Sequence, residues 1–222
     1  SEENLFVQAA LLLRKNVDFQ VTAPGEYKGP AGYDLTILDR IDADLSGPGD
    51  FLLFHPPPSE LFQVQESVKE PQVRRVVRSH PVGRGLSLVD LGVEEATRYV
   101  RQRGDQLVVE GSGGVPLVFQ RDRQEAGQRF VVVAFDVRRS LLPLRYAFPL
   151  LMVNILDALH PQPIGLLPTH RAGTALSLAT TLPPGPLQVR GPEGAVAQAR
   201  WMGDRVLMSS DRAGIYEIWN DA

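Results

Sequence analysis

The sequence contains no cysteine among its 222 residues. This absence excludes disulfide bonds, thiolate metal sites and a cysteine nucleophile. It leaves the cellular compartment open, because proteins without disulfides function on either side of a membrane. The formal net charge is only -3, so no overall field favours nucleic acid or acidic membranes. We therefore expect no nucleic-acid partner.

The sequence also lacks an uninterrupted apolar run of membrane-spanning length, which requires roughly 20 residues. Its most apolar stretch, residues 140–161, is broken by Arg145, Asn154 and Asp157. The apolar residues of this stretch recur at helical spacing and share one face: Phe148, Leu151, Met152, Ile155 and Leu159. We therefore predict a core helix over residues 146–159 and no membrane span.

Helix and strand patterns alternate in the first 162 residues, with short connections rich in Gly, Pro and Asp. An amphipathic helix opens the chain, and residues 88–101 fit a helix and a strand equally well. Strands are predicted within residues 17–24, 33–39, 50–57 and 72–83, and three more within 106–137. This order predicts an α/β fold with a flavodoxin-like sheet and an antiparallel extension.

The segment 161–173 is rich in Pro and Gly and predicts a linker. The short strand patterns that follow are typical of a small β-sandwich. In the last of them, Asp211, Gly214 and Tyr216 resemble the turn in which an immunoglobulin-like domain bonds a tyrosine hydroxyl back to the backbone. An ordinary glycine turn is the alternative. We therefore predict two domains, residues 1–162 and residues 163–222.

Three residues are candidates for a pocket: Asp39, His55 and Arg145. Asp39 and His55 end two predicted strands, and sites form at the carboxyl ends of strands in open α/β sheets. Three prolines follow His55, which argues against a nucleophile elbow, because that turn leads into a helix with free N–H donors. Arg145 lies at the entrance of the predicted core helix, where it could bind an anion or simply be solvated.

Metal and phosphate motifs are missing from the sequence. The histidines do not have metal-ligand spacing, and the acidic residues from Asp39 to Asp44 lack the pattern of a calcium loop. The glycine-rich run at 111–114 lies between two predicted strands and lacks the Lys of a phosphate loop. The basic run at 74–78 has no interleaved aromatic residues. We therefore expect no metal, no cofactor and no nucleic acid.

One resemblance to a known family is present. Residues 131–159, VVVAFDVRRSLLPLRYAFPLLMVNILDAL, resemble a segment of bacterial aerotolerance-regulator (BatA-type) membrane proteins that carry a von Willebrand factor A domain. Four earlier pieces occur in the order which that family shows after its A domain: NLFVQAAL (4–11), GYDLTILD (32–39), FLLFHPPP (51–58) and SHPVGRGLSL (79–88).

The resemblance covers residues 4–160 and implies a domain similar to class I glutamine amidotransferases, followed by a β-rich segment. It also implies a longer protein, anchored by membrane segments outside this chain and placed on the extracytoplasmic face of the bacterial cytoplasmic membrane. Two features of the family are missing here, namely the D-x-S-x-S metal motif of the A domain and the amidotransferase cysteine. Because of these departures, no catalytic or metal-binding residue carries over.

We therefore expect a non-enzymatic interaction or scaffolding region that binds a protein partner. The alternative is a hydrolase or small-ligand-binding domain that uses the strand ends near Asp39 and His55. A sugar-binding role for the C-terminal domain is a third hypothesis, and it would need an exposed Trp201 or Trp219.

Overall fold

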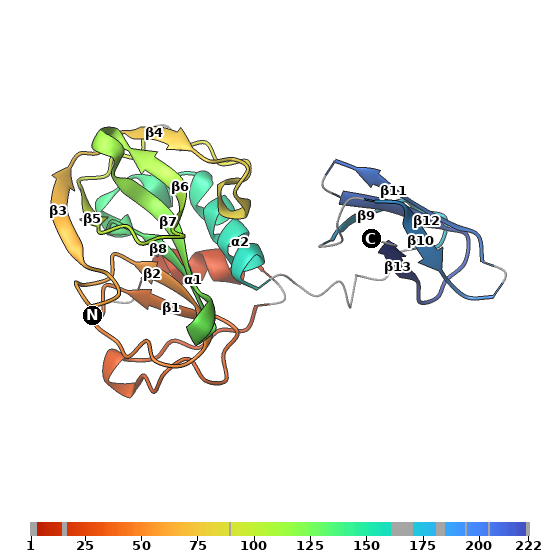
Figure 1. Ribbon diagram of the computed structural model, residues 1–222, viewed down its shortest axis with the longest axis horizontal. Helices are drawn as coiled ribbons and strands as arrows, with labels where there is room; N and C mark the ends of the chain where they lie inside the picture. Colours follow the sequence, from red (N-terminus) through yellow and green to blue (C-terminus); the bar gives the residue numbers. More distant parts are fainter. Residues whose placement is uncertain are drawn as a thin grey trace. The chain divides into compact units, whose positions relative to one another are not determined.

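The computed structural model describes residues 4–14, 17–88, 90–160, 171–180, 185–193, 195–203 and 205–220 (Figure 1). The chain divides into two compact units, residues 1–161 and residues 162–222. This division lies one residue before the predicted domain boundary. Most of the predicted linker, residues 161–170, lies outside the described residues.

A six-stranded mixed sheet forms the centre of the first unit, in the order β1-β2-β8-β7-β6-β4. The first three of these strands are parallel, and β8, β7, β6 and β4 pair in antiparallel fashion. The predicted α/β class is therefore confirmed. The bounds are β1 (Thr36–Asp39), β2 (Gly49–Phe54), β4 (Val73–Val76), β6 (Gln106–Gly111), β7 (Pro116–Arg123) and β8 (Gln128–Val133).

The central strands β2 and β8 are buried on both faces. Phe51 and Leu53 point to one face of the sheet, and Leu52 and Phe54 point to the other. All four side chains are buried. Parallel strands that are covered on both sides need apolar residues at every position, which explains why the sequence of β2 is a continuous apolar run.

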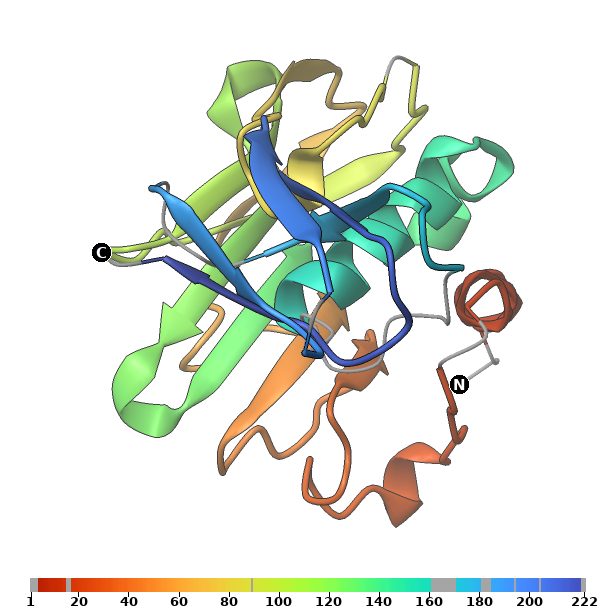
Figure 2. The ribbon, with the colours of Figure 1, turned by 90° about the vertical axis from the view of Figure 1, so that its right-hand side faces the viewer.

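Both α-helices of the described residues pack on one face of this sheet (Figure 2). Helix α1 (Leu5–Leu12) buries Val7, Ala10 and Leu11, and helix α2 (Ala147–Leu159) buries all five residues of its predicted apolar face. The core-helix prediction is therefore confirmed. Within the described residues, the structure contains no helix with the length and hydropathy needed to cross a bilayer.

An antiparallel ribbon of β3 (Val64–Lys69) and β5 (Glu95–Tyr99) belongs to the long connection between β2 and β8. Its Tyr99 joins Phe62 and the aromatic side chains of the sheet in a second hydrophobic cluster. Arg121 on β7 is fully buried beside this cluster. Its guanidinium binds the carboxylate of Asp105 at 2.7 and 2.8 Å and the carbonyl oxygen of Val100 at 3.1 Å.

Two predictions for the first unit change. The strand predicted at residues 17–24 does not form, and a short 3₁₀ helix (Pro24–Glu26) ends this stretch. Its apolar residues Val17 and Phe19 pack as partly buried side chains against the helix-side core without pairing into the sheet. The stretch 88–101, which fitted two structures equally, contains strand β5.

The second unit is built from strands β9 (Leu176–Ala179), β10 (Leu187–Arg190), β11 (Ala197–Met202), β12 (Arg205–Ser210) and β13 (Glu217–Asn220). They form a three-stranded sheet, β11-β12-β9, and a β10-β13 pair. The Tyr216 hydroxyl donates a hydrogen bond of 2.8 Å to the carbonyl oxygen of Arg212, four residues earlier in the chain. Trp201 and Trp219 are both half-buried.

Candidate functional site

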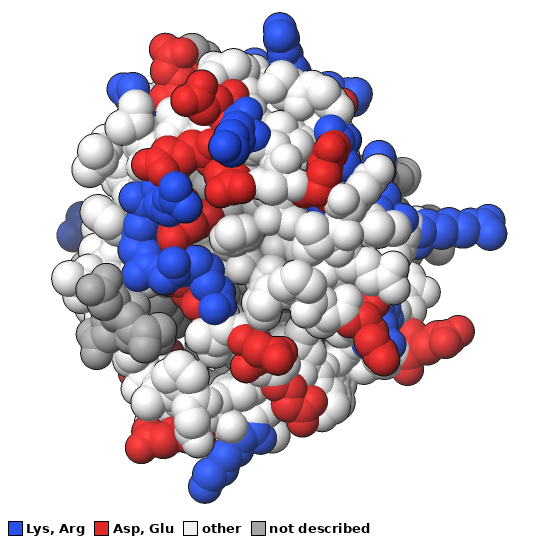
Figure 3. All heavy atoms as spheres, turned by 90° about the vertical axis from the view of Figure 1, so that its left-hand side faces the viewer, with Lys and Arg blue, Asp and Glu red and all other residues white. Residues whose placement is uncertain are grey.

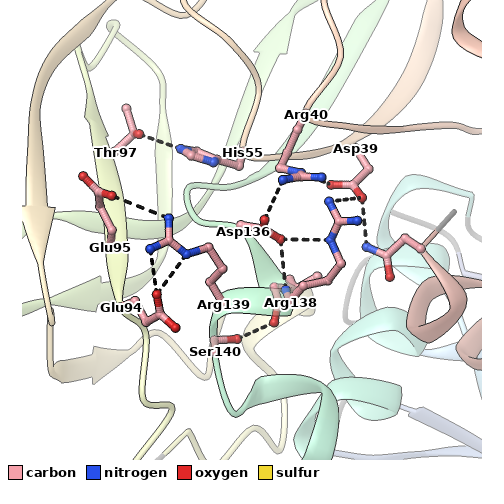
Figure 4. Close-up of polar contacts among 12 residues, drawn as sticks. Asp39, Arg40, His55, Glu94, Glu95, Thr97, Asp136, Arg138, Arg139 and Ser140 are labelled. Atoms are coloured by element: carbon pink, nitrogen blue, oxygen red, sulfur yellow. Dashed lines mark hydrogen bonds and ion pairs between the residues drawn. The ribbon is translucent and has the colours of Figure 1, made fainter. Parts of the chain in front are cut away.

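Polar side chains converge where the three parallel strands end. β1 ends in Asp39, His55 follows β2, and Asp136 comes soon after β8. Because the carboxyl ends of parallel strands meet at one edge of a sheet, the topology brings these groups together. The strand-end cluster consists of Asp39, Arg40, His55, Glu94, Glu95, Thr97, Asp136, Arg138 and Arg139 (Figure 4).

Asp39 lies toward the α1 side of the cluster. Its Oδ2 accepts a hydrogen bond of 3.0 Å from the side-chain amide of Asn4, whose Oδ1 also caps α1. Arg40 and Arg138 approach this carboxylate only to 3.5 and 3.7 Å. Burial raises the pKa of Asp39, and this effect outweighs the hydrogen bond from Asn4 and the nearby positive charges.

His55 connects the end of β2 with the antiparallel ribbon of β3 and β5. Its Nε2 lies 2.9 Å from the hydroxyl oxygen of Thr97 on β5, and its backbone N–H donates to the carbonyl of Val133 at 2.7 Å. Burial lowers the pKa of His55, while the neighbouring carboxylate of Asp136 opposes this shift. The lowered pKa favours the neutral imidazole, which offers one N–H donor and one nitrogen acceptor.

Asp136 organises the centre of the cluster. Its Oδ2 accepts a hydrogen bond of 2.8 Å from Arg40 Nη1, and its Oδ1 accepts one of 3.0 Å from the backbone N–H of Arg138. The second bond caps the 3₁₀ helix Val137–Arg139. Only 8% of the Asp136 side chain is exposed, so it forms the floor of the cluster.

The rim of the cluster is more exposed. Arg139 pairs with Glu94 at 2.7 Å and with Glu95 at 4.0 Å, and more than half of the Arg139 and Glu94 side chains is exposed. A hydrogen bond from Ser67 lowers the pKa of Glu95. On the side of the molecule shown in Figure 3, basic and acidic side chains intermingle in one region, and most of the remaining surface is uncharged.

Two residues of the cluster have a strained backbone. Arg40 and His55 directly follow β1 and β2 and have positive φ angles of 54° and 44°. For residues other than glycine, this left-handed conformation costs about 1–2 kcal/mol. Within the part of the chain that the structure describes, the other non-glycine residues with positive φ are Glu70 and Asp90, which are exposed and lie in a bend and a turn.

Two polar atoms inside the cluster have no hydrogen-bond partner. These are Oδ1 of Asp39 and Nη2 of Arg138, and both are buried. They are an acceptor and a donor that belong to residues only loosely paired with each other. A buried polar atom without a partner is unusual and costs about 1–3 kcal/mol.

The structure brings two of the three predicted pocket residues together. Asp39 and His55 belong to one cluster, and each influences the ionisation of the other. Arg145 is exposed just before α2, and its backbone N–H donates to the carbonyl oxygen of Leu142 at 3.0 Å, so the structure does not place it in this cluster. The sequence reasoning missed Thr97 and Glu94, because residues 88–101 gave no clear strand pattern.

The described residues contain no group of three His, Asp or Glu side chains that could hold a metal ion. The charges of the cluster are instead paired with one another. Arg40, Arg138 and Arg139 each contact at least one carboxylate of the cluster. The cluster therefore offers both hydrogen-bond donors, on its guanidinium groups, and hydrogen-bond acceptors, on its carboxylates.

No protein-family model and no curated protein matches this chain. The resemblance to BatA-type proteins consequently stays a prediction. Solved structures do match. "Cytoplasmic Protein STM3548 from Salmonella typhimurium" has a TM-score of 0.52 and 13% identity, over 71% of this chain and 87% of that one. "Cytoplasmic Protein STM1381 from Salmonella typhimurium LT2" has a TM-score of 0.53 and 12% identity, over 72% and 88%.

At this identity the likeness shows a shared fold alone. Both proteins are described as cytoplasmic, which contradicts the extracytoplasmic location that the family resemblance implied. That expectation was wrong, because it came from the usual position of a family and not from any residue of this chain. Neither description mentions an activity, a ligand or a partner, so the expected scaffolding role and protein partner stay predictions.

Proposed function

We propose that the first unit is a small-ligand-binding domain whose ligand binds over the strand-end cluster. The backbone strain at Arg40 and His55 carries this proposal. Glycine would adopt both conformations without cost, yet the chain places two large polar side chains there, at the ends of adjacent parallel strands. Strain of this kind concentrates at sites where a side chain has to be held in one place for function.

The geometry supports binding over catalysis. The Thr97 hydroxyl, the one nucleophile bonded to His55, belongs to a residue that is only 9% exposed. A substrate carbonyl could not reach it without movement of β5. The neutral imidazole is therefore better suited to positioning Thr97 and donating or accepting a hydrogen bond than to activating an attacking group.

Two finer structural assignments are part of the proposal. We propose that the first unit is an amidotransferase-like relative of the flavodoxin fold, and the parallel order β1-β2-β8 with a site at its carboxyl edge supports this. We propose that the second unit is an abbreviated immunoglobulin-like sandwich, and the Tyr216 turn supports this.

The binding function is tested by a thermal-shift screen of the full chain against defined compound classes, namely monosaccharides, sugar phosphates, amino acids, dicarboxylates and nucleosides. Asp39→Asn is compared with Asp50→Asn. Asp50 lies at the opposite end of the same sheet, also paired with an arginine, and its side chain is 16% exposed against 18% for Asp39.

A ligand of the strand-end cluster will raise the melting temperature of the wild type and of Asp50→Asn, and this rise will be lost in Asp39→Asn. If no compound produces a rise, or if every rise persists in Asp39→Asn, the cluster is not a ligand site.

A further inference from the structure

Building on the proposed binding function, we infer that the ligand is a neutral polyhydroxylated compound of the monosaccharide or cyclitol class. The inference rests on one juxtaposition, in which guanidinium donors and carboxylate acceptors of nearly balanced charge share the rim and floor of a single site (Figure 4). Balanced charge selects against ions, and the mixture of donors and acceptors selects for hydroxyl groups.

The charge balance disfavours charged ligands of either sign. Three guanidinium groups face four carboxylates, and the carboxylates are distributed over both the floor and the rim. An anion that approaches Arg139 also meets Glu94 and Glu95. A cation that approaches these glutamates meets Arg139, and deeper in the site it meets Arg40. A neutral ligand meets neither repulsion.

The hydrogen-bonding capacity fits hydroxyl groups. The two buried atoms without hydrogen-bond partners are one acceptor, Asp39 Oδ1, which lies 3.5 Å from Arg40 Nε, and one donor, Arg138 Nη2, which lies 3.7 Å from Asp39 Oδ2. A ligand reaches them once the side chains of Arg40 and Arg138 turn aside. A hydroxyl group donates one hydrogen bond and accepts others, so two adjacent hydroxyls can serve a carboxylate and a guanidinium side by side. A ligand that has only acceptor atoms would offer no donor to the Asp39 carboxylate.

The rim is able to rearrange around such a ligand. More than half of each side chain in the Arg139–Glu94 pair is exposed, and ion pairs of this kind contribute little to stability. The Arg40 side chain is 37% exposed, and it makes a short hydrogen bond to Asp136 and a looser contact of 3.5 Å with Asp39. The buried floor at Asp136 holds the site in place while the exposed side chains turn toward the ligand.

The test uses matched probes that share a scaffold and differ in charge: glucose, galactose, ribose and myo-inositol, with the phosphate, carboxylate and amine derivatives of each. Binding to the full chain is measured by NMR shift perturbation and calorimetry. The best neutral compound should bind at least tenfold more tightly than its charged derivatives. Its affinity should change less than twofold between 50 and 500 mM salt, because screening acts on charged ligands.

A double variant, Glu94→Gln with Glu95→Gln, provides the specificity test, since it removes the two rim carboxylates and leaves the floor intact. It should narrow or reverse the preference for the neutral compound over its phosphate. Tighter binding of a charged derivative to the wild type would overturn the assignment. So would the absence of neutral binding at 10 mM of each probe.

These outcomes remain distinct from a failure of the proposed function. If another compound class raises the melting temperature and loses this effect in Asp39→Asn, the binding site stands and the polyol assignment falls. If no compound depends on Asp39, both fall.

Discussion

Replacing Asp136 with Asn tests the organisation of the site most directly. The substitution keeps the size of the side chain and keeps an acceptor for the backbone N–H of Arg138. It places an amide N–H group against Arg40 Nη1, where the structure has a charge-assisted bond of 2.8 Å. Hydrogen bonds to charged groups contribute about 1.5–3 kcal/mol, so we expect the free energy of unfolding to fall by about 2 kcal/mol.

Glu94→Gln is the matched control. It also removes a carboxylate paired with an arginine of the same cluster, but the Glu94 side chain is 58% exposed, against 8% for Asp136. The expected loss for this exposed pair is about 0.5 kcal/mol or less. Equal losses in the two variants would refute the argument that burial makes Asp136 the organising residue.

The assay has to report on the first unit. Both tryptophans, Trp201 and Trp219, belong to the second unit, so tryptophan fluorescence would follow the wrong part of the chain. Amide hydrogen exchange in β2 and β8 follows the first unit, because these strands form its core. NMR titration gives a second readout. Since the Asp136 carboxylate raises the pKa of His55, Asp136→Asn should lower that pKa further, and a rise would contradict the reasoning.

Three further predictions concern stability. Burial lowers the pKa of His80 below its usual 6.5, so the unfolded state binds the proton at a higher pH than the folded state does, and the free energy of unfolding should fall from pH 7.5 to 5.5. The variant His80→Asn can still accept the hydrogen bond from the backbone N–H of Val82, and in urea titrations it should show a smaller fall over this pH range. Asp105→Asn leaves the guanidinium of Arg121 buried without its counter-charge, so the free energy of unfolding, measured with denaturant, should fall by about 3–5 kcal/mol. A fall below about 1 kcal/mol would show that the fold does not need this ion pair. In Gly83→Ala the new Cβ would lie 2.2 Å from the carbonyl oxygen of Val77, so the melting temperature should drop by the equivalent of about 2–3 kcal/mol, whereas Gly25→Ala, with open space around it, should change little.

The elements that the sequence predicted well are those with a strong local pattern. Helix α2 follows from an apolar face with helical spacing, and β2 and β8 follow from continuous apolar runs. Strand β3 was missed because its residues are almost all exposed, so neither alternation nor a run marks it. The prediction of a strand at residues 17–24 was wrong, because apolar side chains can also be buried by a segment that has no regular secondary structure.

The site was predicted only where strand ends were visible. Asp39 and His55 were identified because each directly follows an apolar run. Glu94 and Thr97 come from a ribbon inserted far along the chain, and their proximity to His55 depends on long-range pairing that no local pattern encodes. The positive φ of His55 could not be foreseen either, because the sequence there suggests only a proline-rich turn.

The connection that carries β3 and β5 has a consequence for how this fold could acquire new binding properties. The arginines and the central aspartates follow the parallel strands, while Glu94, Glu95 and Thr97 come from β5 and the residue before it, outside the six-stranded sheet. One side of the candidate site can therefore vary through substitutions at Glu94, Glu95 and Thr97, while the parallel strands that carry the other side stay unchanged. Homologous chains that differ mainly at these three positions would be natural sources of altered selectivity.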